Sequence, residues 1–82
     1  MQEPRFDRAA AVEHLELAQW LVDSGYGLIQ RQLQIVFSLE RDGQSSEDAR
    51  MRLMEFEQSQ LARTAHRNRI ASTVGASLAY EA

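Results

Sequence analysis

The sequence contains no cysteine, no lysine, one proline and four glycines in 82 residues. Without cysteine it can form neither a disulfide nor a thiolate metal site. No apolar run approaches the roughly 18 residues that a membrane-spanning helix needs. The opening MQEPRFD lacks the basic and then apolar order of a secretory signal. We therefore expect a cytoplasmic protein that is not embedded in a membrane.

The charge balance is acidic. All nine basic residues are arginine, twelve residues are Asp or Glu, and the net charge is −3. An acidic chain is poorly suited to bind phosphate backbones or anionic membrane surfaces by bulk electrostatics. Because 82 residues form one small domain at most, a monomer would be only marginally stable.

The clearest break in the chain is ERDGQSSEDAR, residues 40–50. Asp42-Gly43 is a turn dipeptide. Ser45 can cap a following helix, with Asp48 three residues on as a capping-box variant. Glu47 and Asp48 place negative charge in the first turn of that helix, where the helix dipole favours it.

These features divide the chain into a hairpin of two helices with a tail at each end. Pro4 suits a first helical turn and Asp7 is an alternative cap, while Gly75 is a candidate stop. The predicted division is an N-terminal tail over 1–6, a helix over about 7–41, a turn over 42–45, a helix over about 46–74 and a frayed tail over 76–82, with the hairpin as a whole covering 7–75. The predicted fold class is therefore all-α, an antiparallel, coiled-coil-like two-helix hairpin.

The first helix carries two apolar stripes when its residues are placed 100° apart. One stripe consists of Ala11, Leu15, Ala18, Val22, Tyr26, Ile29, Leu33 and Val36. The other is displaced by roughly 120° and consists of Ala10, Leu17, Leu21, Leu28, Ile35 and Leu39. One antiparallel partner covers one stripe. A second copy of the chain is the simplest cover for the other, which predicts a homodimer with the architecture of a four-helix bundle.

Two glycines interrupt this helix without changing the phase of its stripes. Gly25 lies within the apolar face, where it allows another helix to approach closely, whereas Gly27 lies on the polar face. They predict a local bend, with a true break as the alternative. The candidate residues of the dimer seam are Leu17, Leu21, Gly25, Leu28, Ile35 and Leu39.

The second helix is less apolar, and Gln60 and Arg67 interrupt its inward face. If the turn is centred on Gly43, residues whose numbers sum to about 86 lie side by side. Gln60 would then lie beside Tyr26, and Arg67 beside Gln19. Such polar layers reduce stability but can determine the register of packed helices.

The sequence also resembles a set of small bacterial helical-hairpin proteins. The similarity lies in a Leu-Glu-Arg-Asp-Gly turn at 39–43, Asp-Ala-Arg at 48–50, Phe-Glu-Gln at 56–58 and a His-Arg-x-Arg segment at 66–69, and it extends back to Gly25 and Ile29. It implies a helical hairpin and no particular activity. Leu28, Leu33 and Phe37 are additional apolar residues relative to that pattern, which predicts stronger association.

Catalysis and metal binding have little support in the sequence. His14 and His66 are the only histidines, and the expected register places His66 near Trp20, well over a turn from His14. The serines lie in helix or cap contexts, without a nucleophile elbow or phosphate loop. We therefore predict no enzyme activity, no metal and no cofactor.

Five residues are candidates for contact with a partner: Trp20, Arg63, His66, Arg67 and Arg69. The arginines could bind phosphate, or they could pair with Glu13 and Glu16 across the hairpin. Trp20 projects away from both stripes, as an interface anchor does, or it is covered by the C-terminal tail, for instance by Tyr80. We predict a non-catalytic assembly or protein-partner-binding module. The alternative is a small nucleic-acid-associated regulator that uses Arg63, Arg67 and Arg69.

Overall fold

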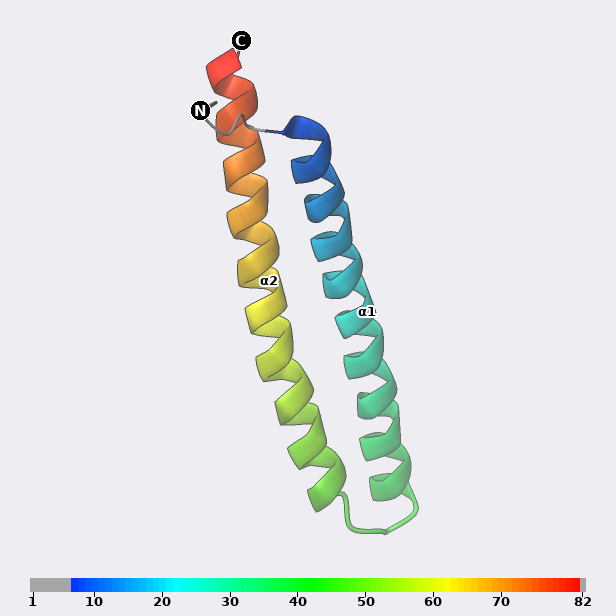
Figure 1. The fold of residues 1–82 in the computed structure, drawn as a ribbon. Helices are drawn as coiled ribbons and strands as arrows, with labels where there is room; N and C mark the ends of the chain where they lie inside the picture. The colour runs from blue at the N-terminus through cyan, green and yellow to red at the C-terminus, as the bar shows by residue number, and fades with distance from the viewer. Residues whose placement is uncertain (1–6, 82) are drawn as a thin grey trace.

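Two long helices form an antiparallel hairpin (Figure 1). A computed structural model describes the backbone of residues 7–81 and the side chains of residues 7–77. Helix α1 spans Arg8–Arg41 and helix α2 spans Glu47–Glu81. The two helices pack side by side along their length, and the molecule measures 65 × 23 × 15 Å. The predicted all-α hairpin is confirmed.

Helix α1 begins after Asp7, which the sequence indicates as a candidate cap. The Asp7 carboxylate accepts a hydrogen bond from the Ala10 N–H at 3.1 Å, which satisfies one of the free donors of the first turn. The helix then runs without interruption through Gly25 and Gly27 to Arg41. A break at the two glycines is therefore excluded.

The end of α1 depends on the glycine of the turn. Gly43 has a φ of +73°, a left-handed conformation that glycine adopts without the steric cost of a Cβ. Its N–H donates to the carbonyl of Glu40 at 3.1 Å, and the N–H of Gln44 donates to the carbonyl of Leu39 at 2.8 Å. This pair of bonds is a Schellman motif, and it closes the last turn of α1.

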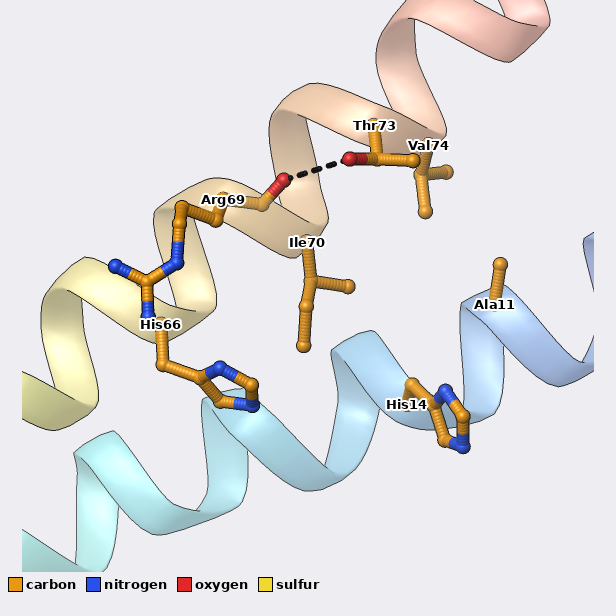
Figure 2. A pocket seen from close by; sticks show the side chains of 7 residues that line it. All are labelled: Ala11, His14, His66, Arg69, Ile70, Thr73 and Val74. Carbon is orange, nitrogen blue, oxygen red and sulfur yellow. Dashed lines mark hydrogen bonds between the residues drawn. The ribbon is translucent and has the colours of Figure 1, made fainter.

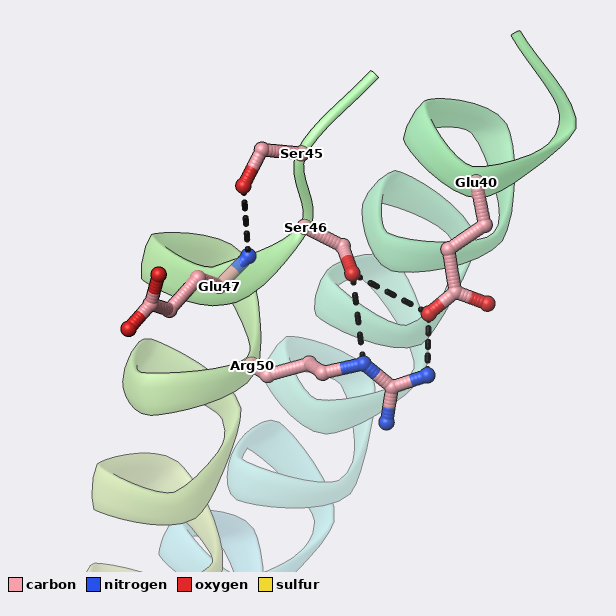
Figure 3. Close-up of polar contacts among 5 residues, drawn as sticks. All are labelled: Glu40, Ser45, Ser46, Glu47 and Arg50. Atoms are coloured by element: carbon pink, nitrogen blue, oxygen red, sulfur yellow. Dashed lines mark hydrogen bonds and ion pairs between the residues drawn. The ribbon is translucent and has the colours of Figure 1, made fainter. Parts of the chain in front are cut away.

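Helix α2 begins at Glu47, whose N–H donates to the Ser45 hydroxyl at 3.5 Å. The hydroxyl of Ser46 connects the two helices through hydrogen bonds (Figure 3). Ser46 donates to a Glu40 carboxylate oxygen at 3.1 Å and accepts from Arg50 Nε at 3.2 Å. Arg50 also forms an ion pair with Glu40. The turn is thus fastened to the end of α1 by an exposed polar network.

This network predicts a dependence of stability on pH. The hydrogen bonds from Arg50 and then Ser46 hold the pKa of Glu40 below its ordinary value of 4.5. A carboxyl whose pKa is lowered by folding stabilises the fold above that value, and the contribution is lost as the pH falls through the folded pKa. We expect Arg50→Gln to lower the melting temperature at pH 7 by no more than a few degrees, because the pair is exposed. The difference from wild type should shrink below pH 4.5.

Thermal melts at a series of pH values measure this effect. Arg52→Gln is the matched control, since it removes the same charge from the same helix outside the network. An Arg50→Gln deficit that stays constant down to pH 3 would contradict the assignment.

The C-terminal end of α2 differs from the prediction. The sequence predicted a helix to about residue 74, a stop at Gly75 and a frayed tail over 76–82, but α2 continues to Glu81. Glycine ends a helix by adopting a positive φ, and within residues 7–81 only Gly43 does so. Gly75 keeps a helical conformation directly after Val74, which is buried against α1. The predicted tail over 1–6 lies outside the described residues.

A narrow seam holds the two helices together. The buried apolar side chains of the described residues are Ala18, Val22 and Val36 of α1 and Val74 of α2. Their α1 members belong to the first predicted stripe. Two glutamines are buried among them, and both cross the seam. Gln32 Nε2 donates to the carbonyl of Ala49 at 3.0 Å, and Gln60 Nε2 donates to the carbonyl of Val22 at 2.7 Å.

Gln60 packs directly against Gly25. A Cβ added to Gly25 would lie 1.8 Å from Gln60 Oε1 and 2.8 Å from its amide carbon. The hydrogen that glycine carries in that direction therefore points towards the amide oxygen, as in a weak Cα–H···O contact. That oxygen is buried and has no other hydrogen-bond partner among the described residues. The predicted polar layer exists: Gln60 meets Gly25 and Val22, and it lines a shallow depression together with Tyr26.

The hairpin has far more surface than a folded chain of its mass. Its accessible area is 6666 Å² at 9.4 kDa, against roughly 5,000 Å² for an average folded monomer. Its radius of gyration is 18.8 Å, against about 12 Å for a compact chain of 82 residues. Two helices that share one seam cannot enclose a core. Much of the apolar surface therefore stays exposed.

Candidate functional site

Much of the second apolar stripe of α1 is exposed in the hairpin. We define the α1 stripe as Leu17, Leu21, Leu28, Ile35 and Leu39. In the single chain Leu17 is 56% exposed, Leu21 37% and Ile35 48%, and the other two are half-buried. The stripe extends over more than six turns of one continuous helix. Its length and composition resemble one side of a helix–helix seam.

Gly25 is a correction to the predicted seam. The sequence placed it among the residues that meet a second copy. In the structure Gly25 is buried inside the hairpin, against Gln60 of its own chain. The close helix approach that a glycine permits therefore occurs within the chain, and the α1 stripe consists of larger side chains only.

At the open end of the hairpin the stripe borders a shallow hollow that α2 completes. Leu17 and Leu21 line it from α1, and Ile70 lines it from α2. His14 and His66 also line it, and Figure 2 shows Ile70 pointing towards α1 between the two histidines. Near this end Arg67 and Gln19, whose numbers sum to 86, are hydrogen-bonded, so the assumed register holds here.

The two histidines do not make a metal site. Within the part of the chain that the structure describes, no three His, Asp or Glu side chains gather closely enough to hold a metal ion. Neither helix, over residues 7–81, has a stretch long and apolar enough to cross a bilayer. The hollow offers apolar side chains with an imidazole on each side.

The arginines of α2 do not form one surface. Arg67 Nη1 donates to Gln19 Oε1 at 2.7 Å across the seam, and its Nε donates to Asn68 at 2.8 Å. The predicted pairing of Arg67 with Gln19 is confirmed. Arg63 Nη1 lies beside Gly25, 3.2 Å from the position of an added Cβ. Arg69 instead borders the hollow of Figure 2, beside His66.

This arrangement bears on the nucleic-acid alternative. Binding of a phosphate backbone needs several cations on one accessible face. Arg63 and Arg67 are half-buried at the seam of the hairpin, and Arg67 has protein partners there. Arg63, Arg67 and Arg69 therefore do not present three guanidinium groups on one accessible face, as contact with a phosphate backbone would need.

Trp20 projects from α1 into solvent and is 61% exposed. It lies on the side of α1 that faces away from α2, as the sequence predicted. The side chain of Tyr80, the alternative cover, lies outside the described residues. A second shallow hollow lies on the same outer side of α1, nearer the turn, between the side chains of Arg31, Gln34, Ile35, Ser38 and Leu39. No pattern in the sequence predicts this hollow, because it depends on how neighbouring side chains of α1 leave space between them.

The opposite side of the hairpin carries a smaller apolar group. Tyr26 and Ile29 of α1 meet Leu61 of α2 around a shallow depression. Leu61 is 73% exposed. Tyr26 was predicted to belong to the inward stripe but lies at its edge, largely exposed, because Gln60 takes the inner position beside Gly25.

Comparison of the chain with models of protein families, with curated proteins and with solved structures returns no match. The resemblance to small bacterial helical hairpins stays a prediction.

Proposed function

We propose that this protein is a non-catalytic assembly module that pairs with a second copy of itself through the α1 stripe. The observation that carries the proposal is the exposure of the large aliphatic side chains of Leu17, Leu21 and Ile35 along that stripe. Two hairpins joined in this way form a four-helix assembly with the two α1 helices at its centre. The candidate seam residues Leu17, Leu21, Leu28, Ile35 and Leu39 lie between them.

The surface area supports a second copy as the occupant. Each hairpin has about 1,700 Å² more surface than an average folded monomer of its mass. A stable interface removes about 800 Å² from each partner, which the elongated hairpin can supply from this one side. The four buried apolar side chains inside the hairpin are a small core for a chain of this length. Burial of the α1 stripe adds the missing apolar contacts.

The chemistry of the stripe also suits self-association. Leucine and isoleucine at helical spacing pack well against an identical row, as in coiled coils. The face of α2 beside the stripe carries His66 and Ile70 rather than a continuous apolar row, so the main contact runs between the two α1 helices.

Light scattering and thermal melts across a range of concentrations test the proposal. We expect a mass of twice 9.4 kDa at micromolar concentration and above. The melting temperature should rise with concentration, because association stabilises the folded state by mass action. A mass of 9.4 kDa at every concentration, with a cooperative melt that does not depend on concentration, would refute it.

A further inference from the structure

The α1 stripe is symmetric about Leu28. Leu21 and Ile35 lie seven residues to either side of it, and Leu17 and Leu39 lie eleven residues to either side. A two-fold axis perpendicular to α1 at Leu28 would place each of these positions opposite its mirror position in an antiparallel copy. Leu28 would meet Leu28, Leu21 would meet Ile35, and Leu17 would meet Leu39. Every stripe residue then has an apolar partner.

A parallel pair would also match the stripe with itself. The parallel and antiparallel orientations differ in where they place the residues on the side of α1 next to the stripe, which we call the flank. Trp20 and Ser38 are eighteen residues apart, which is five full turns, so both side chains project in the same direction from α1. Ser38 lines the second hollow described above, which we call the outer hollow. Its other lining residues are Arg31, Gln34, Ile35 and Leu39. Trp20 and the outer hollow therefore share one flank.

They also lie at the same distance from Leu28, on opposite sides of it. Trp20 is eight residues before Leu28, or about 12 Å along the helix, and the outer hollow is centred seven to eight residues after it. A two-fold axis perpendicular to α1 places the N-terminal half of one copy beside the C-terminal half of the other. It leaves the flanks of both copies on the same side of the pair. It brings Trp20 of each copy to the outer hollow of the other. In a parallel pair the same residues would be about 22 Å apart along the axis.

We infer that the two copies pair antiparallel and that Trp20 of each docks into the outer hollow of the other. The inference rests on the proposed self-association and names the residue that each copy contributes to its partner. The hollow suits an indole. Ile35 and Leu39 provide an apolar floor, the Arg31 guanidinium can stack on the ring, and Ser38 can accept a hydrogen bond from the indole N–H.

Two such anchors would give the interface its specificity. A tryptophan in a pocket buries 150–250 Å² and is among the side chains whose truncation weakens interfaces most. In the single hairpin Trp20 leaves most of its indole in water. Docking removes that exposed surface from both copies at once.

The orientation is tested by single cysteines, since the chain has none of its own. Leu28→Cys should form a disulfide with itself, because two residues on the two-fold axis face each other within reach. Leu21→Cys and Ile35→Cys should each fail to do so alone, and they should cross-link to each other when mixed. Efficient self-linking of Leu21→Cys would show a parallel pair and would overturn the inference.

The docking of Trp20 is tested by its fluorescence, as it is the only tryptophan. Wild-type emission should shift to the blue with increasing concentration. Ser38→Arg fills the hollow about 27 Å from the Trp20 of the same chain, so any effect on its emission comes from the partner. We expect a red shift and a dissociation constant raised at least about tenfold. Gln30→Arg adds the same charge about 200° around α1 from Leu28, on the side away from the stripe, and should change neither.

Light scattering on the same samples distinguishes a failure of the Trp20 docking from a failure of self-association itself. A dimer whose Trp20 emission is the same in wild type and Ser38→Arg would overturn the docking and leave self-association intact. A monomer at all concentrations would refute the proposed function and the docking together.

Discussion

Ile35→Glu should weaken self-association by at least about 100-fold. Ile35 is 48% exposed in the single hairpin, so the fold of one chain does not depend on it, and glutamate is at least as good a helix former as isoleucine. In the proposed dimer the change removes two apolar side chains from the seam. Each is worth about 1.5–3 kcal/mol when buried, and 3 kcal/mol for the pair already corresponds to more than a factor of 100. Burial of the two carboxylates would add to the loss.

The matched control is Leu61→Glu. Leu61 is the most exposed large apolar residue of the described chain, at 73%, and it lies on the opposite side of the hairpin beside Tyr26. The substitution brings the same charge without touching the stripe, so the dimer should persist. Sedimentation equilibrium gives both dissociation constants. If Leu61→Glu dissociates the dimer and Ile35→Glu does not, the interface lies on the side of Tyr26 and Leu61 instead of the α1 stripe, and the proposal fails.

Gly25→Ala and Gly27→Ala should change stability in opposite directions. Alanine in a helix interior is more stable than glycine by about 1 kcal/mol. At Gly27 nothing lies within 4 Å of the added Cβ, so that gain should appear in full. At Gly25 the Cβ would overlap the Gln60 amide, which must move away and lose its bond to the carbonyl of Val22. Loss of a buried hydrogen bond and crowding of the seam outweigh the propensity gain.

We expect Gly25→Ala to be destabilised by a net ~1–2 kcal/mol and Gly27→Ala to be stabilised by about 1 kcal/mol. Urea unfolding at one fixed protein concentration compares the two variants. Gly25→Ala combined with Gln60→Ala should recover part of the loss, because the overlapping atoms are gone. Equal stabilisation by both single substitutions would show that the Gly25–Gln60 contact does not constrain the helices.

Local rules were enough to predict most of the hairpin. Asp7 caps α1 as expected, and Asp42-Gly43 ends it, because these preferences depend on a few neighbouring backbone groups. The two stripes of α1 followed from helical periodicity. The position of Arg67 beside Gln19 followed from the antiparallel register alone.

The errors have physical causes that lie outside local sequence. Gly75 does not stop α2, since a glycine ends a helix only when its backbone turns left-handed, and packing at Val74 holds this segment in the helix. Gly25 was assigned to a second copy although it contacts Gln60 of its own chain, because helical periodicity does not show which neighbouring helix a buried face meets.

The amino-acid sequence by itself determined that this chain forms two helices joined by a glycine turn, and that one helix has more apolar surface than the other can cover. Only the tertiary structure decided which surface is left over. It assigned Gly25 to the Gln60 contact, placed Arg63, Arg67 and Arg69 apart, and left Trp20 and the outer hollow exposed on one side of α1. Helix formation depends on residues three and four apart, whereas the choice of buried face depends on how two whole helices fit together.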